Sequence, residues 1–365
     1  MPGNRRRSSA TRAGRRRLLL GADTLARTGS GIGRVARLMA RVLSDEARDG
    51  NLEGRALTLA GGADGPIPCR SAHGNQAAFA IASQGLSAVT DAFLFDCAGI
   101  ARARPRIPGL RRPFLSWLHG IEVWEGARAD HLGALRAARV LLANSHHTLE
   151  RARDLHAGFE HARVCWLGTE EDTVPAVVDR ERPPTVMILG RMDAREAYKG
   201  HRELIGAWPR IVQAVPNARL VIAGEGSDGP ALQQLAETSG AAAHIEFTGF
   251  VPDDAIDAVW SRATAFAMPS RGEGFGLTYV EAMRRGLPVV ASIHDAAQEI
   301  NLEGETGFNV SLDEPGALTD RLVALLRDQD LAHKLGAAGR ARWRAHFRYS
   351  AFRERFRPHL ARLVA

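Results

Sequence analysis

The sequence of 365 residues predicts an α/β protein with two doubly wound domains that face each other across a cleft. Two observations carry this prediction. Short, nearly continuous apolar runs alternate with segments of helical periodicity, a pattern typical of parallel strands buried on both faces. The length exceeds what one ordinary domain holds, and residues 179–185, with two adjacent prolines and no apolar periodicity, indicate a linker between two halves.

The first half begins with a strand at 16–23 and a helix at 34–47, whose apolar positions recur at helical spacing. Later strands are predicted at 56–62, 92–96, 114–120, 138–145 and 163–168. The second half shows clearer strands, at 185–191, 218–226, 245–251, 263–270 and 287–293. We therefore expect a domain at 18–180, a second at 185–345, and a C-terminal helix at 346–365 that packs back on the first domain.

The charge is uneven. The net charge is +7, and residues 1–17 hold seven arginines and no acid, so residues 18–365 sum to zero. Residues 1–17 are predicted to be a basic, disordered arm, and contact with anionic lipid or nucleic acid is the alternative. Three widely spaced cysteines suggest neither disulfides nor a zinc site, and no apolar stretch is long enough to span a bilayer. A reducing, cytoplasmic location is expected.

Residues 268–292 place one acid in a loop and another inside a helix. Glu273 follows a strand, and a helix is predicted to begin near Gly276 and end at Gly286. Glycines let a ligand approach the backbone, and a helix start favours anions. Glu281 lies about one turn inside and points back toward that start. A diphosphate flanked by two hydroxyl-bearing sugars fits this pattern, although both acids could equally be solvated surface charges.

The same residues carry a specific resemblance. Residues 273–277 followed by Glu281 resemble the Glu-x7-Glu signature of family-4 retaining glycosyltransferases of bacterial type, which have the GT-B fold of two Rossmann-like domains. The resemblance implies that Glu273 binds donor-sugar hydroxyls and Glu281 binds the ribose. It places the backbone contacts with the donor at Gly274, Phe275, Gly276 and Leu277.

Other segments of the second half agree with this resemblance. Residues 188–201 resemble the strand-end Gly-Arg and the later Lys-Gly of the family, so Arg191 and Lys199 would clamp the two phosphates. Gly224 stands in a similar Gly-x-Gly turn, and backbone groups near Phe250 and Val251 would read the base. Residues 295–296 stand where many members of the family have a glycine pair. The resemblance therefore does not determine the contacts of this loop with the donor sugar.

The first half matches the family more loosely. A glycine-rich loop opens a helix, and Gly31 would reach the diphosphate. A dinucleotide fingerprint would need glycine at position 34, where Arg34 stands. His119 ends a strand and would line the cleft near the reacting sugar. Ser145 is predicted to cap a helix.

The resemblance implies transfer of a hexose, with retention, from a UDP- or GDP-sugar to a hydroxyl of a glycan or polyprenyl-linked acceptor, with no metal or other cofactor. Five arginines in 101–114 and the basic arm suit peripheral binding to an anionic membrane at the inner face of the cell membrane. Two other classes stay open: a nucleic-acid-binding protein, disfavoured by the neutral body, and an NAD-dependent dehydrogenase, disfavoured by the missing fingerprint.

Overall fold

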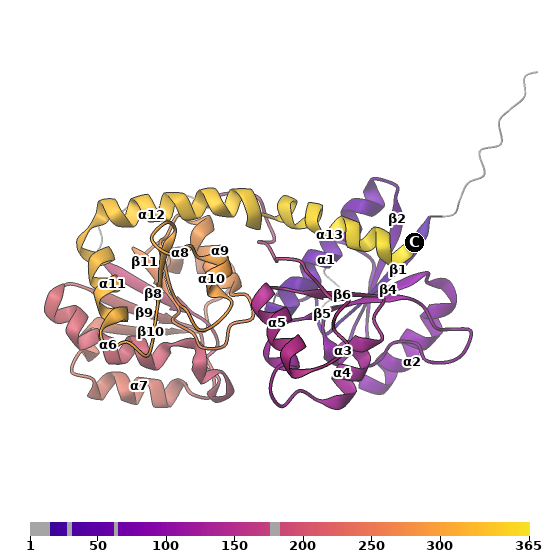
Figure 1. Ribbon diagram of the computed structural model, residues 1–365, viewed down its shortest axis with the longest axis horizontal. Coiled ribbons are helices and arrows are strands. Elements are labelled where there is room, and N and C mark those ends of the chain that lie inside the picture. The colour runs from indigo at the N-terminus through magenta and orange to yellow at the C-terminus, as the bar shows by residue number, and fades with distance from the viewer. Residues whose placement is uncertain (1–14, 28–30, 62–64, 176–182) are drawn as a thin grey trace, which may run out of the picture.

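The computed structural model describes residues 15–27, 31–61, 65–175 and 183–365 (Figure 1). Two sheets, both entirely parallel, form separate domains that lie side by side and are joined along one edge by the C-terminal helices. This confirms the predicted α/β class with two parallel-sheet domains. The linker predicted at 179–185 lies mostly outside the described residues, and so do residues 1–14 of the basic arm.

The N-terminal sheet has seven strands in the order β3-β2-β1-β4-β5-β6-β7. Its strands are β1 (Arg16–Ala22), β2 (Leu52–Thr58), β3 (Cys69–Ser71), β4 (Ala92–Phe95), β5 (Phe114–Leu118), β6 (Val140–Ala143) and β7 (Arg163–Val164). Its helices are α1 (Gly31–Arg48), α2 (Gln76–Leu86), α3 (Ala98–Ala101), α4 (Ala129–Arg136) and α5 (His146–Leu155). Short 3₁₀ turns lie at Ser87–Val89 and Ile121–Val123.

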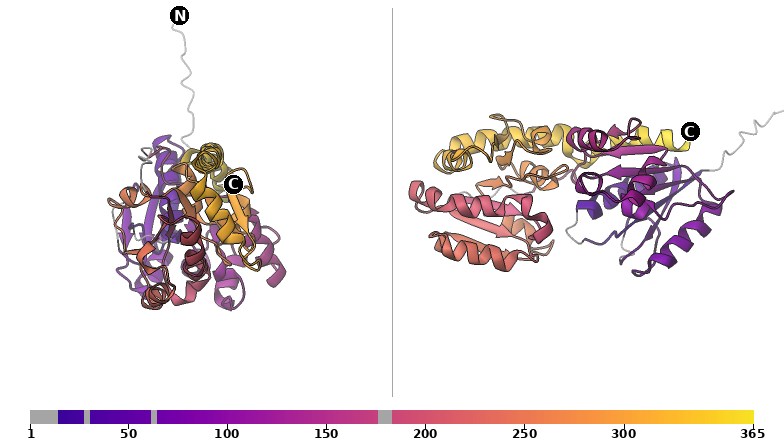
Figure 2. Two further views of the ribbon diagram at one scale, coloured as in Figure 1. Left: turned by 90° about the vertical axis from the view of Figure 1, so that its left-hand side faces the viewer. Right: turned by 60° about the horizontal axis from the view of Figure 1, so that its bottom comes forward.

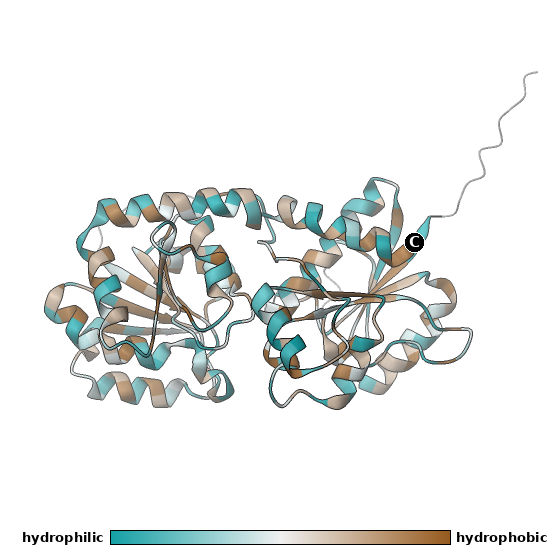
Figure 3. Ribbon diagram, viewed as in Figure 1, coloured by the Kyte–Doolittle hydropathy of each residue, from teal (hydrophilic) through white to brown (hydrophobic). Residues whose placement is uncertain are grey.

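Both faces of this sheet are buried, as the apolar runs require. In β4, Leu94 packs into the core shared with α1, while Phe93 and Phe95 pack into a second core with α3 and α4. Successive side chains of a strand point to opposite faces, so a strand covered on both sides must be apolar throughout. Figure 3 shows this directly, with hydrophobic residues concentrated along the strands of both sheets.

The C-terminal sheet has six strands in the order β10-β9-β8-β11-β12-β13. Its strands are β8 (Thr185–Leu189), β9 (Arg219–Ala223), β10 (Ile245–Gly249), β11 (Ala265–Ala267), β12 (Val289–Ser292) and β13 (Gly307–Val310). Its helices are α6 (His201–Ala214), α7 (Gly229–Thr238), α8 (Ile256–Trp260), α9 (Leu277–Arg284), α10 (Ala297–Ile300), α11 (Ala317–Arg327) and α12 (Gln329–Arg342). Residues Ala194–Lys199 and Ala242–His244 form 3₁₀ turns.

The chain returns to the N-terminal domain at its end (Figure 2). After α12, a π-helical turn at Trp343–Phe347 leads into α13 (Tyr349–Val364). Phe352 and Phe356 of α13 stack on Trp117 of β5, with ring centroids 6.4 and 6.0 Å apart. Arg353 reaches Glu46 of α1 at 2.8 Å.

Several element bounds differ from the sequence expectation. β2 begins at Leu52 rather than at 56, because residues 52–55 already alternate between buried positions, Leu52 and Gly54, and exposed positions, Glu53 and Arg55. Arg16 and Arg17, which the sequence expectation placed both in the strand at 16–23 and in the arm, belong to β1. The three-residue β3 and the strand β13 were not anticipated. Within the described ranges, none of the helices is long and apolar enough to cross a bilayer.

Candidate functional site

The two domains touch where the loop after β11 meets the carboxyl ends of β5 and β6. Gly274 lies at the centre of this contact, and a Cβ built on it would lie 2.0 Å from the carbonyl oxygen of His119. Its own carbonyl accepts hydrogen bonds from Ser145 Oγ at 2.6 Å and Thr148 Oγ1 at 3.1 Å. Only glycine permits so close an approach of two backbones, so position 274 fixes how closely the domains meet.

Helix α9 starts from this loop. Gly276 precedes it with a φ of 84°, a left-handed conformation that favours glycine. Phe275 is buried and meets Phe347 edge-on at 6.1 Å, whereas Leu277, the first helical residue, is half-buried. Gly286, with a φ of 70°, ends the helix as predicted. The glycines at 276 and 286 therefore allow the backbone conformations at the two ends of α9. The first amides of this helix lie just after the interdomain contact at Gly274.

Glu273 is anchored through its backbone by the loop after β12. Its N–H donates to Asp295 Oδ2 at 2.9 Å, and its carbonyl accepts from the amide of Ala296 at 3.2 Å. Burial raises the pKa of Glu273, an effect that the nearby charge of Lys199 opposes. The side chain that replaces a glycine of the family, Asp295, thus holds the candidate catalytic loop in place.

Arg191 and Lys199 lie close together because a third residue joins them. Glu196 pairs with Lys199 Nζ at 2.7 Å and with the guanidinium of Arg191. The 3₁₀ turn Ala194–Lys199 accommodates the long spacing between Arg191 and Lys199 and folds Lys199 back over the end of β8. Its Nζ lies 3.8 Å from a Cβ built on Gly190. Glu196 has no recognisable motif, so sequence reasoning missed it.

Glu281 lies in the second turn of α9 among three arginines. Arg285 Nη1 is 2.6 Å from its carboxylate, Arg34 Nη1 of the N-terminal domain 3.4 Å, and Arg284 Nη1 3.7 Å. Burial raises the pKa of Glu281, but the charges of Arg34, Arg285 and Arg284 outweigh burial and leave this pKa below its ordinary value. Glu281 is therefore an anion that faces the other domain.

The predicted base-binding residues lie at the neighbouring strand ends. Gly224, with a φ of 130°, follows β9, and a Cβ on it would lie 2.0 Å from the carbonyl oxygen of Gly190. Its N–H donates to the carbonyl of Gly249 at 3.0 Å. Just beyond β10, Phe250 is 57% exposed and Val251 is half-buried against the core. Packing alone accounts for glycine at 224, whereas the exposed ring of Phe250 is free to meet a ligand.

On the N-terminal side, His119 follows β5 and Gly31 is the first residue of α1. Nε2 of His119 lies 2.5 Å from the carbonyl oxygen of Asp96, and burial lowers the pKa of His119 to about 4. The ring is therefore neutral near pH 7, and because Nε2 must donate to a carbonyl, Nδ1 is left as an acceptor. Ser145 caps α5 as predicted, accepting from the amide of Thr148 at 2.9 Å.

Glu299 joins the domains from a position where the family motif also has a glutamate. Its carboxylate accepts hydrogen bonds from the amides of His146 at 2.9 Å and His147 at 2.6 Å, and from Trp166 Nε1 at 3.0 Å. A carboxylate at the first amides of α5 also complements the helix dipole. Glu299 thus acts as an interdomain cap here, a role that its sequence position alone did not reveal.

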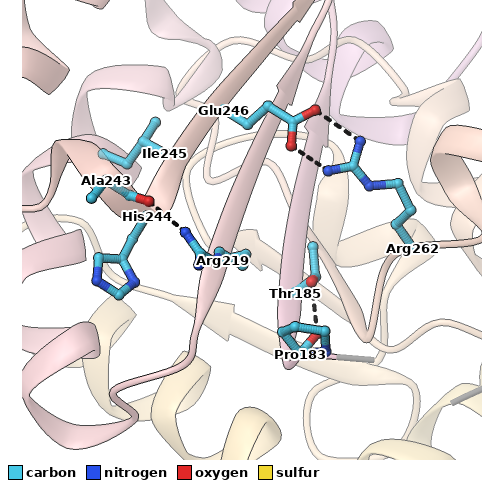
Figure 4. Close-up of a pocket in the computed structure, with 8 residues that line it drawn as sticks. All are labelled: Pro183, Thr185, Arg219, Ala243, His244, Ile245, Glu246 and Arg262. Carbon is cyan, nitrogen blue, oxygen red and sulfur yellow. Dashed lines mark hydrogen bonds and ion pairs between the residues drawn. The ribbon is translucent and has the colours of Figure 1, made fainter. Parts of the chain in front are cut away.

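One pocket lies away from this interface (Figure 4). It opens at the amino ends of β8, β9 and β10, the sheet edge opposite the candidate site. Its two arginines are already engaged, Arg262 with Glu246 at 2.8 Å and Arg219 with the carbonyl of Ala243. The pocket lies at the amino ends of the strands, whereas ligands of such sheets bind outside the carboxyl ends, so it is not a candidate donor site. No cluster of metal-ligating side chains occurs among the described residues.

Comparison with known sequences finds similarity in the C-terminal half of the chain. Residues 170–342 match the family model described as glycosyl transferases group 1. The chain is 39% identical over 157 residues to phosphatidyl-myo-inositol mannosyltransferase of Mycobacterium leprae. It is 38% identical over 172 residues to the GDP-mannose-dependent alpha-(1-6)-phosphatidylinositol monomannoside mannosyltransferase of Mycobacterium tuberculosis. These alignments cover 42% and 44% of this chain and span only 40% and 44% of the relatives.

Comparison with solved structures covers both domains. Anabaena HepE in complex with UDP and glucose superposes with a TM-score of 0.76 at 19% identity, covering 94% of this chain and 99% of that one. Sucrose-phosphate synthase from Thermosynechococcus elongatus gives a TM-score of 0.77 at 19% identity, covering 96% and 99%. At such identities the likeness shows the fold alone, and that fold is the GT-B arrangement which the resemblance implied. The segment that carries Arg191, Lys199, Glu273 and Glu281 lies within residues 170–342, which match the glycosyl transferases group 1 model.

Proposed function

We propose that this protein is a retaining, metal-independent glycosyltransferase that moves a hexose from a UDP- or GDP-sugar to a hydroxyl of a glycan or lipid-linked acceptor. The arrangement of Arg191, Lys199 and Glu273 beside the start of α9, within a glycosyl transferases group 1 domain, carries this proposal. The names of the mycobacterial relatives favour GDP-mannose as donor and a phosphatidylinositol-based acceptor. Neither nucleic-acid binding nor dehydrogenase activity finds support among the relatives.

In this mechanism Arg191 and Lys199 bind the diphosphate and stabilise the charge that grows on it as the sugar departs. Glu196, which pairs with both cations in the structure, gives them up to the phosphates. Glu273 accepts hydrogen bonds from the donor sugar, and Glu281 from the ribose. The acceptor hydroxyl attacks the same face through an oxocarbenium-like state, and the departing phosphate oxygen takes its proton. Two protein cations thus serve where other enzymes use a metal.

A hydrolysis screen tests this function. The protein is incubated with UDP-, GDP- and ADP-sugars without acceptor, with and without EDTA. We expect slow release of one nucleoside diphosphate, unchanged by EDTA, and a loss of about 10²-fold for Glu273→Gln, comparable to removing an electrostatic contact to the reacting group. Glu237→Gln, an exposed position on α7, is the matched control. Full activity of Glu273→Gln, or no turnover of any donor, would contradict the proposal.

We also propose that the enzyme acts in the cytoplasm, bound peripherally to the inner face of the cell membrane. The loop between α3 and β5 supports this. Arg106 and Arg111 are exposed and, among the described residues, pair with no acid, and Ile107 between them is 53% exposed. Arginines around an exposed apolar residue suit an anionic lipid surface.

A further inference from the structure

Arg34 stands where a dinucleotide fingerprint would need a glycine. In the structure its side chain contacts the C-terminal domain. It lies in the first turn of α1, and its Nη1 is 3.4 Å from Glu281 Oε1 on α9. The side chain is 27% exposed, so it stands at a partly covered position between the two domains. A charge-assisted hydrogen bond of this kind is normally about 2.7–2.9 Å long, so this contact is loose.

The acids around Glu281 are shared unevenly among the neighbouring arginines. One carboxylate faces Arg34, Arg284 and Arg285. Arg285 also pairs with Asp257, and Arg284 with Glu171 at 3.3 Å. Arg34 has no second acid within the part of the chain that the structure describes, so it is the cation with least compensation.

We infer that Arg34 binds the diphosphate of the donor nucleotide from the N-terminal domain. The inference rests on the proposed function, in which Glu281 holds the ribose. The ribose carries the diphosphate, so a guanidinium beside Glu281 lies within reach of the first phosphate. A planar guanidinium matches phosphate oxygens with two parallel hydrogen bonds. Arg34 would exchange one loose contact for such a pair, and the bound donor would then tie both domains together.

The burial of the residues around Glu281 supports a phosphate contact by Arg34. Arg284 and Arg285 are only 11% and 7% exposed, so charge near Glu281 is poorly screened by water. The pKa of Glu281 lies below its ordinary value, with Arg34 the largest of the three charges that outweigh burial. The local potential is therefore positive, and a phosphate is the donor group that would neutralise it.

A double-mutant cycle with GDP and UDP as probes tests the inference. Binding is measured by titration calorimetry for the wild type, Arg34→Gln, Glu281→Gln and the double variant. We expect Arg34→Gln to weaken binding of the preferred nucleotide about tenfold, or about 1.4 kcal/mol, and to do so equally in the Glu281→Gln background. Arg34→Lys keeps the charge but lacks the planar guanidinium, so its affinity should lie between those of the wild type and Arg34→Gln. Arg48→Gln, exposed at the end of α1, should bind normally.

Unchanged affinity in Arg34→Gln would overturn the inference. So would a loss that disappears in the Glu281→Gln background, because Arg34 would then act only by orienting Glu281. If the wild type bound neither nucleotide, the donor site itself would be wrong, and that outcome is distinct from both of the others. Unfolding curves for each variant exclude a loss caused by misfolding.

Discussion

At the scale of single residues, the N-terminal domain holds a buried acidic cluster beside the site. Asp96, at the end of β4, is fully buried, and its Oδ2 accepts from the amide of Asp23 at 2.9 Å while its Oδ1 has no partner among the described residues. Burial raises the pKa of Asp96 to about 7 and that of Glu122 to about 8. Near neutral pH these carboxyls are therefore partly protonated, in the same region where the ring of His119 is neutral.

Asp96→Asn is predicted to change how stability depends on pH. In the unfolded chain Asp96 ionises near its ordinary value, whereas in the folded protein its pKa is about 7. Between these two pH values the folded state holds more protons, so the contribution of Asp96 to the free energy of unfolding falls as pH rises, by up to about 1.4 kcal/mol per pH unit.

Asparagine does not ionise, so the free energy of unfolding of Asp96→Asn, taken relative to the wild type, should rise from pH 5 to pH 8. Urea denaturation at the two pH values measures this difference. Asp23, Cys97 and Glu122 interact electrostatically with Asp96, and all three are present in both proteins. A difference that is the same at both pH values would contradict the prediction.

At the scale of elements, α13 shows how an arginine-rich segment can be part of a core. Its buried face repeats at helical spacing through Phe352, Phe356, Leu360 and Leu363. Two of the arginines between them, Arg353 and Arg357, face α1 and share Glu46 at 2.8 and 3.0 Å. The helix thereby covers β5 and β6 and completes the N-terminal domain with the last residues of the chain.

Phe356→Ala is predicted to destabilise the protein by about 3–5 kcal/mol, the usual cost of removing a fully buried aromatic ring. The ring is 0% exposed and stacks on both Trp117 and Phe352. Urea denaturation measures the change. Glu354→Ala, on the exposed face of the same helix, should alter stability by no more than about 0.5 kcal/mol. Equal effects of the two substitutions would show that α13 does not depend on this contact.

At the scale of the whole molecule, the excess charge is concentrated rather than spread. The net charge of +7 equals that of residues 1–17, while exposed arginines of the α3–β5 loop form a second basic region. Helix α2 adjoins that loop through Gln84, which bonds the backbone of Arg104 and Arg106, and it exposes Ile81 at 72%. Helix α2 has no charged residue. An uncharged helix beside arginines extends the proposed membrane-binding surface.

Replacing Arg106 and Arg111 together with glutamine should weaken binding to liposomes that contain phosphatidylinositol. Each basic residue near such a surface contributes about 1 kcal/mol, so the loss should be roughly 30-fold. Co-sedimentation at 0.1 M salt measures it. The control replaces two exposed arginines elsewhere, Arg210 and Arg344, in the same way. Binding that is equally strong to purely neutral liposomes would remove the electrostatic explanation.

Much of the architecture was predictable because it depends on local pattern. Strands β8, β9 and β12 of the C-terminal sheet are apolar runs that adjoin a glycine or a proline, and α9 has a glycine at each end. β3 escaped prediction because it is three residues long and half-exposed, so it lacks the apolar run that marks a buried strand. The start of β2 was missed because Gly54, at a buried position, has no apolar side chain, and the charged residues Glu53 and Arg55 stand on either side of it.

The sequence by itself determined the two parallel-sheet domains and the loop-to-helix stretch of residues 273–281, because backbone preference and apolar periodicity act between near neighbours. The tertiary structure alone decided that Arg34 meets Glu281, that Asp295 holds the backbone of Glu273, and that Glu299 caps α5. Arg34 and Glu281 lie 247 positions apart, and His146 and Glu299 lie 153 apart. No local pattern encodes these two pairs, since each forms only when the two domains have packed together.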